Sequence, residues 1–306
     1  MHFTRLSSFR SLVLGALVLG HVSLVHADAP KSAASTQKNE HQEAVSSALK
    51  VIQSGPTDVK LIDQAFLKLP EGYGFIPSQQ AGRLMRSMGN VMPEDPVGMI
   101  VPLSGGNWFV VVRFDPAGYI KDDDAKDWNA EELLTNIKDG TEEANKERKS
   151  RGISELEVLG WVEPPKYNAT SHQLVWSISS REKGDLNPEQ RGINYNTYAL
   201  GRDGFISMNL VTDLKSIEEQ KPIAHSLLAG LEFGSGKRYA DFNASTDKVA
   251  AYGLAALVGG LAAKKLGLLA VIAAFFIKFS KVFILAGLAI AAGFGKWWVS
   301  RKNPKT

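Results

Sequence analysis

Few side chains of this sequence are placed to carry out covalent or metal chemistry. The 306-residue chain contains no cysteine, which excludes disulfides, thiolate metal sites, iron–sulfur clusters and a cysteine nucleophile. Three of its histidines, His41, His172 and His225, follow the N-terminal leader, and no two of them have the spacing of metal ligands on one element. We therefore predict no metal site, no cofactor and no catalytic residue, and we expect a protein that is not an enzyme.

Two polar segments resemble binding loops but lack a required residue. Residues 234–238 resemble a phosphate loop, yet the first glycine is missing and Arg238 stands where a Ser or Thr would bind magnesium. Asp122–Asp124 with Asp127 could collect calcium, but the loop lacks the glycine of an EF-hand, and a solvated loop before a helix is the simpler interpretation. Asp122–Asp124, and Asp203 beside Arg202, remain available to an envelope-acting hydrolase or transferase, which is an alternative function.

Aromatic side chains give the one positive indication of binding. Five aromatic residues lie on or between successive predicted strands, and Arg202 lies at the tip of a predicted hairpin; the aromatic residues are Trp161, Tyr167, Trp176, Tyr195 and Tyr198. Together they predict an aromatic-walled groove with a cationic rim, able to bind a partner or an apolar ligand, and the residues singled out for ligand binding are Trp161, Tyr167, Trp176 and Arg202. The alternative is a core with amphipathic aromatic residues at its edge.

The elements that position these residues follow from the spacing of apolar side chains. Alternation predicts strands, and the run 108–112 is apolar enough for a central strand covered on both faces. Helices are predicted at 78–88, at 129–150 behind a cap at Asn129, and at 213–231, where Pro222 is expected to kink or split the helix. The expected fold is α+β, an antiparallel sheet with packed helices in a sandwich-like arrangement. The predicted strands cover residues 65–69, 73–76, 99–103, 108–114, 155–161, 171–179, 192–200 and 205–211.

The N-terminus has the pattern of a secretory signal peptide. Arg5 and Arg10 precede an apolar run at 12–20 that is too short to cross a bilayer, and the small residues Val25 and Ala27 predict cleavage after residue 27. An uncleaved anchor is the alternative. Residues 28–57 are expected to form a flexible segment with one short helix, and residues 58–248 to form an exported α+β domain.

The C-terminus has the composition of a membrane anchor. Lysine pairs separate three apolar runs at 249–263, 266–277 and 282–299, and only the third, roughly 27 Å as a helix, approaches the thickness of a bilayer core. We expect one or two transmembrane helices within 249–299 and a basic tail at 300–306. Charge counting does not decide between one span and a hairpin, and a buried soluble helix pair is a further alternative.

The middle of the chain is acidic and its two ends are cationic. All 32 acidic residues but only 25 of the 35 basic residues fall within residues 28–248, which gives this part a net charge of −7 and leaves both ends cationic. The basic residues therefore belong to segments expected to contact a membrane, so we expect a membrane partner and no nucleic acid. These features predict a bacterial inner-membrane protein whose soluble domain faces the periplasm.

An ordered set of motifs resembles one known family. The motifs are LPEGY at 69–73, MGN at 88–90, GYIKDDD at 118–124, GW at 160–161, PPKY at 164–167, LVW at 174–176, NY at 194–195, LGRDG at 200–204 and DKVAAYGL at 247–254. Together they resemble the bacterial membrane-anchored proteins grouped as domain of unknown function 2167. The resemblance implies an exported domain and membrane attachment, and it assigns no activity, ligand or site residue. The leading hypothesis is an envelope protein that binds a protein, lipid or other apolar partner, and an accessory subunit of a membrane complex is a further alternative.

Overall fold

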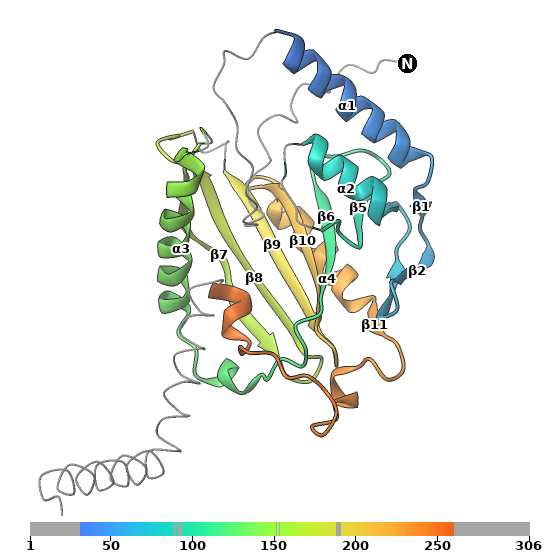
Figure 1. Ribbon diagram of the computed structural model, residues 1–306, viewed down its shortest axis with the longest axis vertical. Helices are drawn as coiled ribbons and strands as arrows, with labels where there is room; N and C mark the ends of the chain where they lie inside the picture. Colours follow the sequence, from blue (N-terminus) through green and yellow to red (C-terminus); the bar gives the residue numbers. More distant parts are fainter. Residues whose placement is uncertain are drawn as a thin grey trace, which may run out of the picture.

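The computed structural model describes residues 31–88, 90, 94–150, 152, 154–187 and 191–259 (Figure 1). The predicted signal peptide, the predicted anchor beyond residue 259 and the basic tail lie outside these ranges. Within them, no helix combines the length and the apolar character that a membrane crossing requires.

A large antiparallel sheet forms the centre of the fold. Its eight strands lie in the order β1-β4-β5-β6-β10-β9-β8-β7. Strands β7, β8, β9 and β10 form a meander, and β10 also pairs with β6 through seven residue pairs. The strands are β1 Gln53–Ser54, β4 Tyr73–Pro77, β5 Gly98–Pro102, β6 Phe109–Asp115, β7 Leu156–Asn168, β8 Gln173–Glu182, β9 Gly192–Leu200 and β10 Phe205–Asp213.

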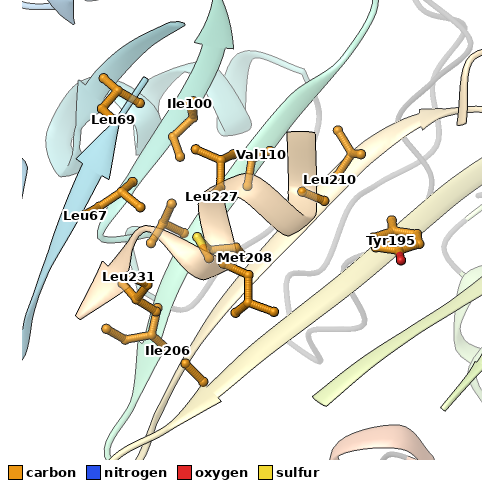
Figure 2. Packing of buried hydrophobic residues seen from close by; sticks show 14 of the residues in the cluster. Leu67, Leu69, Ile100, Val110, Tyr195, Ile206, Met208, Leu210, Leu227 and Leu231 are labelled. Atoms are coloured by element: carbon orange, nitrogen blue, oxygen red, sulfur yellow. The ribbon is translucent and has the colours of Figure 1, made fainter. Parts of the chain in front are cut away.

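A small sheet and one helix cover the first face of the large sheet. The small sheet has the order β11-β3-β2, built from β11 Leu231–Phe233, β3 Ala65–Leu69 and β2 Thr57–Leu61. The helix α4, Ile217–Ala229, packs on β9 and β10. Figure 2 shows the resulting central core, in which the labelled residues are Leu67, Leu69, Ile100, Val110, Tyr195, Ile206, Met208, Leu210, Leu227 and Leu231.

The second face is covered in two separate parts. Helices α1 Lys31–Leu49 and α2 Ser78–Ser87 cover β4 and β5, where Ile76 and Met99 are buried, and Val111 of the neighbouring β6 belongs to the same cluster. At the other edge, α3 Ala130–Ser150 packs on β7, and after the turn η3 Tyr239–Asp241 the described part of the chain includes a helical stretch at 255–259 (Figure 1). An aromatic cluster forms there, with its buried members Ile120, Leu133, Leu174, Trp176, Leu200, Phe205, Tyr239, Leu254 and Val258.

The α+β class with a large antiparallel sheet is confirmed, and β6 has the expected double cover. Val110 and Val112 face the central core, while Phe109 and Val111 face α1 and α2. The strand prediction for 192–200 matches β9, and Asn129 caps α3 by accepting from the N–H groups of Glu131 and Glu132.

In the segment at 28–57, expected to be flexible with a short helix, the structure forms the 19-residue helix α1. The second half of α1 is held by Ala44 and Ala48, which are small enough to pack closely on α2, and by Arg83 of α2, which binds Glu40 and Glu43. The predicted helix at 213–231 is also shorter than expected, since the chain leaves α4 at Gly230 and Leu231 begins β11.

Candidate functional site

The second face of the large sheet carries a polar row between its two apolar parts. Register places Trp176 of β8 opposite Asn196 of β9, and Asn196 opposite Asn209 of β10. Directly opposite residues of antiparallel strands share one face, so these three side chains lie side by side. We call Trp176, Asn196 and Asn209 the polar row. Its neighbour on β6 is Val111, and the helices beside it pack on β4–β5 and on β7.

Two polar atoms of this row are buried without a hydrogen-bond partner among the described residues. They are Nε1 of Trp176, whose side chain is 9% exposed, and Oδ1 of Asn209. Nδ2 of Asn209 donates to Oδ1 of Asn194, and Nδ2 of Asn196 donates to the carbonyl of Asn194, so the amide nitrogens of both side chains are bonded. A buried polar atom without a partner costs about 1–3 kcal/mol, and a bound molecule that supplied an acceptor and a donor would remove that cost.

Three aromatic rings lie together at one end of the polar row, and we call Trp161, Trp176 and Tyr198 the aromatic wall. The rings of Trp161 and Trp176 meet edge to face at 6.2 Å between centroids, and Tyr198 is stacked on Trp176 at 6.4 Å. Nε1 of Trp161 donates to the carbonyl of Ala130, which joins the cluster to α3. Burial raises the pKa of Tyr198, and the nearby indole N–H of Trp176 offsets part of that rise. The indole N–H and the Tyr198 hydroxyl do not form a hydrogen bond, so Nε1 of Trp176 stays without a partner within the described part of the chain.

A cation on the same face comes from β6. Arg113 lies opposite Ser207, and Ser207 lies opposite Tyr198, so the guanidinium side chain belongs to the row next to the polar row. Arg113 is partly buried, and this burial lowers its pKa. The sequence pattern contains no sign of this cation, because it lies within a strand that otherwise reads as apolar.

Tyr167 packs against the aromatic cluster, and two polar partners hold its hydroxyl. Its hydroxyl donates to Oδ2 of Asp122 at 2.7 Å and lies 3.1 Å from Nδ1 of His172. The His172 ring is stacked on Tyr239 at 4.0 Å. Burial, and secondly the hydrogen bond to Asp122, raise the pKa of Tyr167, so this phenol stays neutral.

Arg202 is not brought to the aromatic wall as a free rim cation. It lies in the turn between β9 and β10 and binds Asp247 through Nε at 2.6 Å and Nη2 at 2.7 Å, and Nη1 donates to the carbonyl of Gly236. The structure thus gathers Trp161, Tyr167 and Trp176 into one cluster together with Tyr198. It places Tyr195 in the central core on the opposite face of the sheet, and it pairs Arg202 with the C-terminal segment. Ligand binding by any of the four residues singled out for it stays a prediction.

A family model described as "Protein of unknown function (DUF2167)" matches residues 53–289. The chain belongs to this family. No curated protein matches. Among solved structures, the DUF2167 chain is similar to the solution structure of cyanobacterial PsbP (CyanoP) from Synechocystis sp. PCC 6803. That match has 12% identity and a TM-score of 0.35, and it covers 60% of this chain and 91% of that chain.

Three of the four carboxylates available to a hydrolase in this DUF2167 chain have internal partners, and the fourth, Asp123, is exposed. Asp122 accepts from Tyr167, Asp124 accepts from two backbone N–H groups at 254–255, and Asp203 accepts from Lys237 at 2.7 Å. Within the described ranges, no group of three or more His, Asp or Glu side chains is arranged to hold a metal ion. These contacts give the three partnered carboxylates structural roles.

A second polar network is not visible in the sequence pattern. The hydroxyl of Tyr195, on the central-core face of β9, donates to Oε2 of Glu163 at 2.7 Å and lies 2.8 Å from Nε2 of His225. Burial, and secondly the bond to Glu163, raise the pKa of Tyr195. A phenol that is harder to ionise is a poor nucleophile, which argues against a catalytic role for Tyr195. Its two contacts instead tie β7 and α4 to β9. No sequence motif links residues 163, 195 and 225.

Proposed function

We propose that this DUF2167 chain is a membrane-anchored envelope protein whose exported acidic domain binds a partner or an apolar ligand along the polar row and its aromatic wall. The proposed location is the bacterial inner membrane with the domain in the periplasm, supported by the signal-peptide pattern, the cationic ends and the three apolar runs. The proposal does not include an enzymatic activity.

The unsatisfied pair of polar atoms in the polar row carries this proposal. Trp176 and Asn209 stand on strands separated by β9, which places their backbones about 10 Å apart. A ligand that satisfied both atoms would therefore reach across β9 with an acceptor for the indole N–H and a donor for the Asn209 oxygen, and it would offer an apolar surface to the indole and phenol rings. Such a mixture of rings and a few convergent polar groups is typical of binding sites.

The test uses the full-length protein purified in detergent, with mass spectrometry of the proteins and lipids that copurify. The variant Trp176→Phe with Asn209→Leu removes both unsatisfied atoms, together with the hydrogen bond from Asn209 to Asn194. Both positions keep large apolar side chains, so we expect folding to be retained and the companion to decrease at least tenfold. Alanine at Trp176 would be a poor choice, because truncating a buried Trp costs about 3–5 kcal/mol by itself.

The matched control is Trp108→Phe, because Trp108 is as buried as Trp176 but belongs to the central core on the other face. We expect this control to copurify the wild-type amount of the companion. Equal recovery from all three proteins, or no stoichiometric companion of the wild type, would refute the proposal. A membrane-protein companion lost only when the residues beyond 259 are changed would favour an accessory subunit.

A further inference from the structure

The chain that leads into the predicted anchor is hydrogen-bonded to the domain through its backbone. The N–H of Tyr119 donates to the carbonyl of Lys248, and the N–H of Ala250 donates to the carbonyl of Tyr119, both at 2.8 Å. These two bonds form a parallel bridge between Tyr119 and Val249. The approach is close at Gly118, where a Cβ would lie 2.6 Å from the Lys248 carbonyl oxygen. Residues 248–250 are thus paired like a short strand.

A single carboxylate then caps the helix at 255–259. The two oxygens of Asp124 accept from the N–H groups of Leu254 and Ala255, each at 3.0 Å. A carboxylate at this position satisfies N–H groups that have no partner within the helix. Gly253 allows the approach, since a Cβ there would lie 2.3 Å from Oδ2 of Asp124.

The same segment is buried in the aromatic cluster and ion-paired at its start. Leu254 is 0% exposed and Val258 is 2% exposed. Asp247 binds Arg202 and also accepts from the N–H of Asn243 at 2.7 Å. Pairing, capping, burial and an ion pair therefore all act within residues 247–258, which is far more than a flexible linker would show.

From these contacts we infer that residues 249–259, the first part of the first apolar run, belong to the folded domain, and that the membrane-embedded part begins after them. The inference rests on the proposed membrane attachment. It places Lys264 and Lys265 near the membrane surface and so avoids the cost of about 2.5–3.5 kcal/mol for each lysine at mid-bilayer.

Single-cysteine labelling in the otherwise cysteine-free chain tests where the membrane begins. In membrane vesicles with the domain exposed, a membrane-impermeant maleimide should label Ala251→Cys within about tenfold of the rate for Ser245→Cys, since both positions are solvent-exposed. Ala286→Cys, in the third apolar run, should resist labelling. Protection of the Ala251→Cys variant that is lifted only by detergent would overturn the inference. Free labelling of the Ala286→Cys variant, with protein absent from the membrane pellet, would instead refute membrane attachment itself.

A distance measurement tests whether the segment is fixed. Spin labels at Asp139→Cys on α3 and at Ala251→Cys should give one narrow distance distribution in the full-length protein. Asp124→Ala should broaden it, whereas the neighbouring Asp123→Ala should not, because Asp123 is exposed and does not cap the helix. A broad distribution in the unaltered background would overturn the inference, whatever the outcome for Asp124→Ala.

Discussion

Arg202 and Asp247 bind one another through two hydrogen bonds that join the β9–β10 turn to the C-terminal segment. Arg202 first, and then the N–H of Asn243, hold the pKa of Asp247 well below its usual range. A carboxyl whose pKa is depressed by folding stabilises the fold above its unfolded pKa of about 3.9 and loses that contribution as pH falls.

We therefore predict that Asp247→Asn lowers the urea midpoint at pH 7 and has a smaller effect at about pH 3. Asparagine keeps one acceptor but carries no charge, so its stability should change less between the two pH values than that of the wild type. Arg202→Lys should give an intermediate result, because lysine keeps the charge without the two-pronged geometry. Equal losses for Asp247→Asn at both pH values would contradict the assignment.

Sequence reasoning found the aromatic residues of the candidate site more readily than their roles. Trp161 and Trp176 share a face because Trp161 pairs with Ile178, two residues from Trp176 on β8, so alternation along β8 and the β7–β8 register fix it together. Its place at a hairpin tip predicts Arg202 as a rim cation. Its actual partner, Asp247, lies 45 residues further along the chain, so local spacing does not reveal it. The unsatisfied atom of Asn209 depends on which strands are neighbours, so it could not be read from spacing.

At the scale of elements, β7 is an edge strand held by a side chain of α3. Its pairing with β8 shifts register three times, and Pro164 and Pro165 lie within it, both features that discourage pairing with another chain. Asn145 of α3 is 2% exposed, and its amide donates to the carbonyl of Leu156 and accepts from the N–H of the same residue, both at 2.8 Å. This side chain takes the place of a partner strand at the start of β7.

Replacing Asn145 by Leu should therefore destabilise the protein by about 2–4 kcal/mol, because two backbone groups would lose their partner in a buried place. Chemical denaturation measures the loss, and hydrogen exchange should show faster exchange of the Leu156 amide. Asn136→Leu, on an earlier turn of the same helix and partly exposed, is the control and should cost less than about 1 kcal/mol. A similar small loss for both variants would show that the amide does not hold the strand.

The elements that sequence reasoning missed are short and depend on distant partners. Strand β11 has three residues and exists because Leu231 pairs with Leu67 of β3, and β2 falls partly in a segment whose composition suggested flexibility. The longer strands β8, β9 and β10 were found because alternation over nine or ten residues outweighs local noise.

At the scale of the whole molecule, the order of strands joins two parts of the chain that the sequence does not connect. The hairpin between β9 and β10 follows from its Asp-Gly turn, but the pairing of β10 with β6 brings together residues nearly one hundred positions apart. That pairing creates the second face on which the polar row lies. Neither local propensity nor spacing contains this information.

The charge asymmetry and the N-terminal pattern together yield a prediction about the mature protein. With Arg5 and Arg10 before a short apolar run, and Val25 and Ala27 as the small residues, export should remove residues 1–27 and leave Asp28 as the first residue. Intact mass and N-terminal sequencing of protein purified from membranes would measure this directly. Ala27→Tyr should retain the precursor because a large side chain does not fit the cleavage position, whereas His26→Tyr should be processed normally. A mature chain that still begins at Met1 would instead indicate an N-terminal anchor, and the acidic domain would then be attached to the membrane at both ends.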